Sequence, residues 1–179
     1  MSSLDIGYAS IKFIVAEMNK KKLYVLTSSI VNNDAIKKDM TIDYDILEAI
    51  IKKILSDTKE KLGIEIKKTL LTISSDSASF TINKAKIDIK NEDNLVTTDD
   101  MIKVVNLSGK NVVQDNMELV NITPLYYTLD DSSRTDIPVN TFSKTLEVQS
   151  IITSSRKDDV YKYLRVLDNL GVSVVDISY

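Results

Sequence analysis

Runs of apolar residues along the first part of the chain predict three strands joined by tight turns. Residues 11–18 are apolar nearly throughout, as in a buried strand, and residues 23–31 have a similar character. A polar turn at residues 19–22 separates these runs, and the short apolar stretch 2–6 precedes them. The three strands therefore form an antiparallel meander, and its first hairpin is LDIGYASIK, residues 4–12.

A helix and a fourth strand are predicted after the meander. Apolar residues recur at three- and four-residue spacing from Leu47 to Leu62, which is typical of a helix with one buried face. Asp43 is the expected N-cap, and Gly63 is the expected stop because glycine readily takes the left-handed conformation. An apolar strand over residues 64–74 follows. Residues 1–75 are therefore expected to run β-β-β-α-β.

The end of the chain repeats the step from helix to strand. Ser154 or Ser155 is the expected cap of the last helix, Gly171 is its expected stop, and residues 172–178 form the next strand. We expect this strand to lie parallel to residues 64–74 in one sheet, with the intervening segment as a long excursion.

The excursion, residues 76–153, has the pattern of a small domain inserted into the first. Its apolar and polar residues alternate over 80–89, and a capping box at Thr97 and Asp100 begins a helix that Gly109 is expected to end. Two strands follow, at 118–129 and 144–153, and Pro124 predicts an edge or a bulge in the first of them. The order is strand, helix, strand, strand.

The composition narrows the possible chemistry. The 179 residues are 43% apolar and 27% charged, as in a folded globular protein, and they include no cysteine and no histidine. A thiol nucleophile, a disulfide framework and a histidine base are thereby excluded. The net charge of −3 does not favour nucleic-acid binding. No apolar stretch is long enough to span a membrane and no secretory signal is apparent, so a cytoplasmic location is expected.

Several short motifs, in order along the chain, resemble those of the actin-like ATPase family that includes the bacterial cell-division protein FtsA. LDIGYASIK is similar to the family's first phosphate loop, Asp-Ile-Gly-Thr/Ser-x-x-x-Lys. The other matching segments are AIKKDMTIDYDILEAI at 35–50, NITPLYYTLD at 121–130, DIPVN at 136–140 and LGVSVVDI at 170–177. The ordered set is more specific than any single motif. The type IV pilus protein PilM shares this architecture and is the alternative.

The resemblance implies a mixed α/β (α+β) fold. Residues 1–75 and 154–179 would form an incomplete actin-like, ribonuclease H-like subdomain 1A, and residues 76–153 would form the inserted subdomain 1C. We expect the chain to be the N-terminal part of a longer protein, although the sequence leaves open a naturally short one. The parent would link the FtsZ ring to the cytoplasmic face of the membrane at the division site. Its membrane contact would run through a C-terminal tail absent here, while subdomain 1C would mediate self-association and contacts with other division proteins.

The resemblance also implies a phosphate site at the first hairpin. In the family, Asp5 would act through a bound magnesium ion, the backbone N–H groups of residues 7–10 would wrap the terminal phosphates, and Lys12 would supply a positive charge. The candidate residues are Asp5, Gly7, Tyr8, Ala9, Ser10 and Lys12. No second phosphate loop is present, so we expect no catalytic residue, no metal site and no cofactor in this chain. Mg-ATP is expected only in a full-length protein.

Tyr8 departs from the family pattern, which has threonine or serine there. Its ring either points away and leaves the loop backbone intact, or crowds the phosphate. Lys20, Lys21 and Lys22 are interpreted as a solvated hairpin tip, with acidic lipid as the alternative partner. Tyr126 and Tyr127 are expected on opposite faces of a strand, one in the core and the other as an exposed contact residue.

Overall fold

The computed structural model describes residues 1–37, 41–74 and 78–179. The chain divides into two compact units, of which the first comprises Met1–Asp76 with Asp158–Tyr179 and the second comprises Ser77–Lys157. The predicted boundary at residues 75–76 lies outside the described residues, as does the 38–40 part of the matching segment 35–50.

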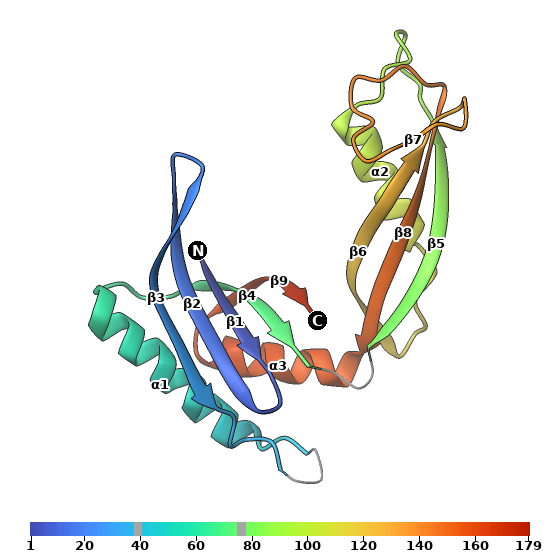
Figure 1. Ribbon diagram of the computed structural model, residues 1–179. Helices are drawn as coiled ribbons and strands as arrows, with labels where there is room; N and C mark the ends of the chain where they lie inside the picture. The colour runs from blue at the N-terminus through green and yellow to red at the C-terminus, as the bar shows by residue number, and fades with distance from the viewer. Residues whose placement is uncertain (38–40, 75–77) are drawn as a thin grey trace. The chain divides into compact units, whose positions relative to one another are not determined.

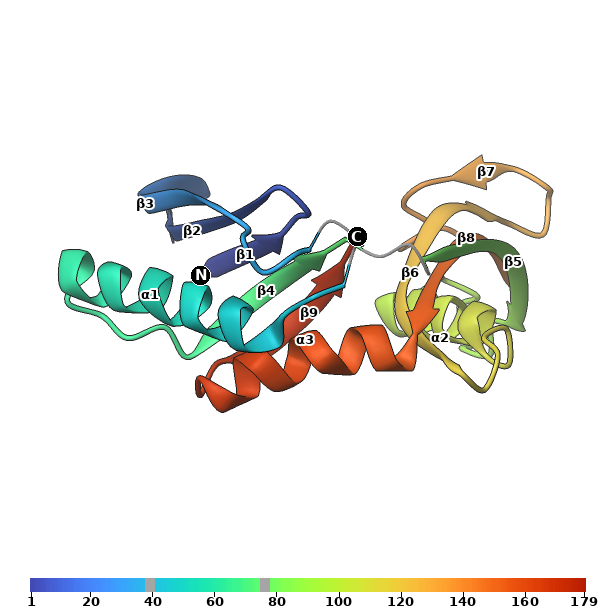
Figure 2. The same ribbon diagram turned by 90° about the horizontal axis from the view of Figure 1, so that it is seen from below.

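The first unit is a five-stranded sheet in the order β3-β2-β1-β4-β9, with two helices on one face (Figures 1 and 2). Its strands are β1 (Ser2–Ile6), β2 (Ser10–Asn19), β3 (Lys22–Asn32), β4 (Lys68–Ile73) and β9 (Ser173–Ser178), and its helices are α1 (Tyr44–Leu62) and α3 (Lys157–Asn169). The meander β1-β2-β3 is antiparallel, as predicted, whereas β4 is parallel to both β1 and β9. This confirms the prediction that the strands following α1 and α3 are parallel neighbours in one sheet.

The core of this unit lies between the sheet and the two helices. Alternate residues of the strands and one face of each helix are buried there: Leu4, Ile6, Ile11, Phe13, Val15, Leu71 and Ile73 from the sheet, and Leu47, Ile51, Ile54, Tyr163, Val166 and Leu167 from the helices. The Asp43 carboxylate accepts the N–H of Ile46, which confirms this N-cap. Gly63 and Gly171 have φ of 67° and 70°, which confirms both predicted glycine stops.

Two predicted boundaries in this part of the sequence are wrong. Strand β4 begins at Lys68 rather than at 64, since its ladder with β9 begins at the pair of Lys68 and Ser173 and its ladder with β1 begins only at Leu70. Ser154 and Ser155 do not cap a helix. They belong to strand β8, where they pair with Ser79 and Glu118, and α3 begins only at Lys157. Long-range pairing here prevails over the local preference of serine for a cap.

The second unit is a four-stranded antiparallel sheet in the order β5-β8-β6-β7 with one helix on one face. Its elements are β5 (Ser79–Asp88), α2 (Thr98–Gly109), β6 (Met117–Thr128), β7 (Arg134–Thr135) and β8 (Thr145–Arg156). The capping box of Thr97 and Asp100 is confirmed. The ladder of β6 is irregular between Pro124 and Tyr126, which confirms the predicted bulge. The two-residue strand β7 was not predicted.

Gly109 is the last residue of α2, which confirms the predicted end of this helix, although its backbone is not left-handed like that of Gly63. Its role is close packing, because a Cβ there would collide with Cδ1 of Ile122. Tyr127 is buried in the core, as predicted, but Tyr126 is half-buried rather than exposed, and the Arg134 guanidinium lies over its ring.

None of the helices in the described residues is both long enough and apolar enough to cross a membrane.

Candidate functional site

The first hairpin closes in a tight turn between β1 and β2. The N–H of Gly7 donates to the Ser10 carbonyl at 3.0 Å, so Tyr8 and Ala9 form the tip of the turn. A Cβ at position 7 would lie 3.0 Å from that carbonyl oxygen, which explains the glycine. The Gly7 N–H is therefore used within the turn. The phosphate-binding role of the backbone N–H groups of residues 7–10 stays a prediction. Because the Gly7 N–H is already bonded, this role would belong to the N–H groups of residues 8–10.

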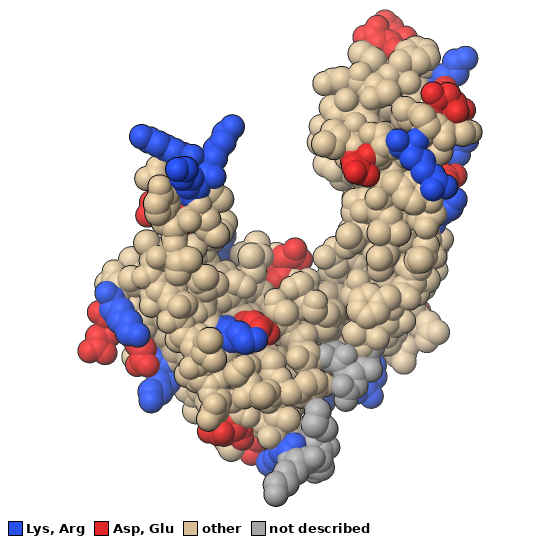
Figure 3. All heavy atoms as spheres, in the orientation of Figure 1, with Lys and Arg blue, Asp and Glu red and all other residues tan. Residues whose placement is uncertain are grey.

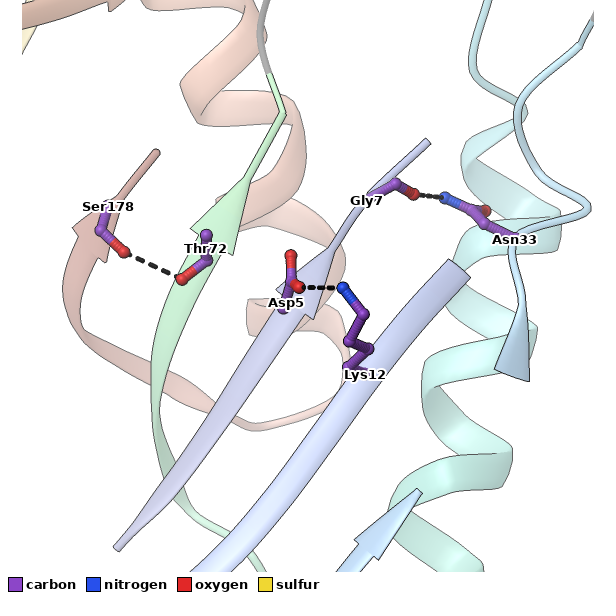
Figure 4. Close-up of polar contacts among 6 residues, drawn as sticks. All are labelled: Asp5, Gly7, Lys12, Asn33, Thr72 and Ser178. Atoms are coloured by element: carbon purple, nitrogen blue, oxygen red, sulfur yellow. Dashed lines mark hydrogen bonds and ion pairs between the residues drawn. The ribbon is translucent and has the colours of Figure 1, made fainter. Parts of the chain in front are cut away.

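Asn33, which the sequence reasoning missed, holds this turn from the side (Figure 4). Its Nδ2 donates to the Gly7 carbonyl at 2.7 Å, and its backbone N–H donates to the Ala9 carbonyl at 3.1 Å. Its Oδ1 accepts the N–H of Ala35 at 3.3 Å, and the residue is only 6% exposed. One buried carboxamide thus ties the first hairpin to the chain that leaves β3. Its only signal in the sequence is a pair of asparagines directly after an apolar strand.

A row of four polar side chains crosses the sheet beside the turn (Figure 4). The register of neighbouring strands aligns Lys12 with Asp5, Asp5 with Thr72, and Thr72 with Ser178. The Lys12 ammonium donates to the Asp5 carboxylate at 2.9 Å, and the hydroxyls of Thr72 and Ser178 lie 2.9 Å apart. The sequence predicted Asp5 and Lys12 but not the two hydroxyl groups, because only the parallel ladder brings β4 and β9 beside β1.

The row lies on the face of the sheet opposite the helices, since its neighbours Leu4, Ile6, Leu71 and Ile73 are all buried on the helix side. It also lies near the carboxyl ends of the parallel strands β1, β4 and β9, where open α/β sheets bind their ligands. The ion pair of Lys12 and Asp5 is partly exposed, so it stabilises the fold by less than about 1 kcal/mol. The Lys12 ammonium is therefore held only weakly by Asp5.

Tyr8 lies within electrostatic reach of a cluster of tyrosines on the helix side. Burial raises the pKa of the Tyr163 phenol, and the neighbouring Tyr44, Tyr8, Asp159 and Tyr179 raise it further. The rings of Tyr44 and Tyr163 meet edge to face, with centroids 6.2 Å apart. The tyrosine cluster is a feature that sequence reasoning did not predict, because its members come from four separate segments.

The chain is similar to bacterial cell-division proteins over almost its whole length. No protein-family model matches the chain. Cell division protein FtsA of Bacillus subtilis (strain 168) is 21% identical over 175 residues, which cover 98% of this chain and 40% of the relative. FtsA of Streptococcus pneumoniae is 22% identical over 176 residues, covering 98% and 38%, and FtsA of Enterococcus hirae is 21% identical over 174 residues, covering 97% and 39%. The resemblance to FtsA is confirmed. The chain spans about two fifths of the length of these FtsA proteins.

The solved structures agree on the fold. A chain of the PilM-PilN type IV pilus biogenesis complex superposes with a TM-score of 0.62 and 13% sequence identity, covering 99% of this chain and 46% of that chain. The mixed α/β fold of this FtsA-like chain is therefore actin-like. The roles predicted for Asp5, Gly7, Tyr8, Ala9, Ser10 and Lys12 stay predictions, since the comparisons concern the chain as a whole.

Replacing Asn33 by alanine should lower the free energy of unfolding by about 1 to 3 kcal/mol, because the Gly7 carbonyl and the Ala35 N–H lose their partner. The exposed neighbour Asn32 offers a matched control, and Asn32→Ala should change stability by less than about 0.5 kcal/mol. Urea unfolding followed by circular dichroism measures both. Equal losses in the two variants would contradict the role assigned to Asn33.

Stability should also fall at alkaline pH. The folded state holds the Tyr163 proton more tightly than the unfolded chain, whose tyrosine has a pKa near the ordinary value of about 10. This contribution is therefore fully present below pH about 10 and is lost as pH rises above it. Tyr163→Phe should flatten the alkaline decline measured by urea unfolding between pH 8 and 11, and Tyr24→Phe, at an exposed site, should not. An unchanged decline in Tyr163→Phe would be the contrary result.

Proposed function

We propose that this chain is an assembly module of an FtsA-like protein that acts in bacterial cell division. In this proposal the parent protein links the FtsZ ring to the cytoplasmic face of the membrane, and Ser77–Lys157 contacts the next subunit and other division proteins. Two observations support it: similarity to FtsA over 97–98% of the chain, and the actin-like fold. The PilM-like alternative has weaker support, because a likeness at 13% identity concerns the fold alone.

An uncovered sheet face in the second unit carries this proposal. Helix α2 covers the face that includes Ala85 and Ile87, so alternate residues of β5 point to the other side. Two large apolar side chains lie there, Phe80 at 66% exposed and Ile82 at 63% exposed, and Ile82 is level with Ile151 of β8. Because β5 is also one of the two edge strands of the described sheet, both its side chains and its backbone are placed to meet another protein.

Ordered polar groups continue along the same face. Lys84 and Glu147 form an ion pair at 3.2 Å, and the Tyr126 hydroxyl donates to Gln149 at 2.6 Å. The Arg134 guanidinium stacks 4.3 Å from the centre of the Tyr126 ring. An apolar patch beside fixed aromatic and arginine groups is the pattern of a protein-binding surface, in which a few such anchors supply most of the affinity.

Placing a charge on the apolar patch tests the assembly role. Phe80→Glu should weaken self-association and binding to partner division proteins at least tenfold, about 1.4 kcal/mol, because the carboxylate would be buried in the contact. Ile137→Glu, at an equally exposed apolar residue of the same unit, is the matched control and should have little effect. Sedimentation velocity at rising concentration measures self-association, and titration calorimetry with purified FtsZ and full-length FtsA measures partner binding. A monomer that binds neither protein would refute this proposal.

An ATP-binding core is the second candidate, favoured by the polar row Lys12–Asp5–Thr72–Ser178 at the carboxyl ends of the parallel strands. On this reading Asp5 would orient the waters of a magnesium ion, and Lys12 would contact phosphate oxygens. Millimolar Mg-ATP should then raise the melting temperature, since saturation at 100 times Kd adds about 2.7 kcal/mol. Asp5→Asn should abolish the shift and Asp88→Asn, in the other unit, should keep it. No shift in the unmodified chain would set this candidate aside for this chain.

A further inference from the structure

The sheet of the second unit has two edges, and only one of them is protected against pairing with another strand. At the protected edge, β6 carries Pro124 and has register shifts at Leu119/Asn121 and at Pro124/Tyr126, and β7 pairs with its end. Proline, bulges and very short edge strands are the devices by which proteins prevent edge-to-edge pairing. The described part of the other edge strand, β5, has none of them. All of Ser79–Asp88 pairs with β8 residue by residue, without a register shift.

The first half of β5 also carries no charge. Ser79–Asn83, with the sequence SFTIN, contains no charged residue, whereas the second half contains Lys84, Lys86 and Asp88. Charged side chains, lysine above all, discourage pairing at an edge. Among the described residues β5 pairs with β8 alone, so no strand lies beside the outward backbone N–H and C=O groups of its first half. Ser79–Asn83, which we call the open edge, is therefore a regular and uncharged template for an added strand.

The side chains of the open edge are sorted by face. Phe80 and Ile82 lie on the face of the sheet away from α2, where they are 66% and 63% exposed. Thr81 and Asn83 lie on the α2 side, where Nδ2 of Asn83 donates to the Ser108 carbonyl at 2.7 Å. One face of the open edge is thus apolar, and the other carries hydroxyl and carboxamide groups.

This pattern is complementary to itself about Thr81. When two open edges are placed antiparallel across a two-fold axis at Thr81, residue 80 of each copy is opposite residue 82 of the other, and residue 79 is opposite residue 83. Phe80 then meets Ile82 twice on the apolar face, and Thr81 meets Thr81 between two pairs of serine and asparagine on the polar face. An aromatic residue opposite a β-branched one, and threonine opposite threonine, are favourable cross-strand pairs.

Neighbouring registers match less well. A two-fold axis at Ile82 places Phe80 opposite Lys84, and an axis at Lys84 places that lysine opposite the same lysine of the other copy. An axis at Phe80 matches only residues 79–81 of the described strand. The axis at Thr81 matches the whole open edge and leaves the lysines outside the match.

We propose that the open edge pairs with the open edge of a second copy of this chain, antiparallel and in the register centred on Thr81. The two sheets then become one continuous sheet, with both α2 helices on the same face. The match forms about four to six hydrogen bonds between the strands, since alternate residues exchange two each. A standard interface has about 20 to 30 residues a side, so this smaller contact gives a weak dimer, with a dissociation constant above about 1 μM. The inference rests on the assembly role proposed above, and it names the partner and the geometry of the surface at Phe80.

Disulfide formation tests the register, because the chain contains no cysteine of its own. In the proposed dimer the two Thr81 Cα atoms lie about 4.5 to 5.5 Å apart, a distance that a disulfide bridges. Oxidised Thr81→Cys should therefore form covalent dimers at about 1 mM protein. The matched control is Ser79→Cys, at an exposed residue on the same face of the strand. It should form none, because the two copies of residue 79 would lie four residues, roughly 14 Å, apart.

A charge exchange tests whether Thr81 meets the same residue of the other copy. Thr81→Lys and Thr81→Glu should each weaken self-association at least about threefold, because like charges then lie directly opposite each other. An equimolar mixture of the two variants should restore association as a mixed dimer, since the lysine of one chain then faces the glutamate of the other. Sedimentation velocity measures the association, and native mass spectrometry identifies the mixed dimer. A merely structural effect of either substitution is not relieved by mixing.

The contrary results separate this inference from the assembly role. Self-association that is lost in Phe80→Glu but unchanged in Thr81→Lys and Thr81→Glu would overturn the register and keep the assembly role. Equal cross-linking of Thr81→Cys and Ser79→Cys would do the same. A chain that stays monomeric at about 1 mM, yet binds FtsZ or full-length FtsA in a way that Phe80→Glu abolishes, would overturn the second copy as the partner of this edge. A monomer that binds neither protein would overturn both proposals.

Discussion

The first unit depends on one constraint, the parallel ladder that joins β1 to β4 and β4 to β9. The register that buries Leu4, Ile6, Leu71 and Ile73 against the helices also puts Asp5, Thr72 and Ser178 side by side on the opposite face. Core residues and polar-row residues thus alternate along the same strands, and their side chains point to opposite faces of the sheet. A slip of one residue would send the core side chains outward and the polar row inward, so the stability of the core also fixes the geometry of the candidate site.

The shape of the first hairpin does not depend on a bound phosphate. Its shape is fixed by elements that do not touch a ligand: the hydrogen bond within the Gly7 turn, the close approach that requires glycine, and the carboxamide of Asn33. The Tyr8 phenol contributes to the raised pKa of Tyr163 on the helix side. The hairpin is needed by the sheet whether or not it binds phosphate.

Both units leave one face of their sheet uncovered by helices of the described chain, and on both faces large apolar side chains lie beside ordered or localised charge. In the second unit the patch at Phe80 and Ile82 adjoins the Lys84–Glu147 pair. In the first unit Ile14 and Ile30 are exposed on the open face, and Lys20, Lys21 and Lys22 lie at the tip of the β2–β3 hairpin (Figure 3). Exposed apolar area of this kind is a cost to an isolated protein, and burial against another chain removes it.

The sequence by itself determined the element types, both glycine stops, the Asp43 and Thr97 caps, the parallel return strand and the ordered motifs that resemble FtsA, because these depend on local periodicity, backbone preference and residue identity. It predicted two of the four side chains in the polar row. Tertiary structure alone decided that Thr72 and Ser178 complete the row, that Asn33 holds the turn, and that Ser154 and Ser155 lie in a strand. Each of these depends on hydrogen-bonded pairing between segments more than twenty residues apart, and no local pattern records which segments become neighbours.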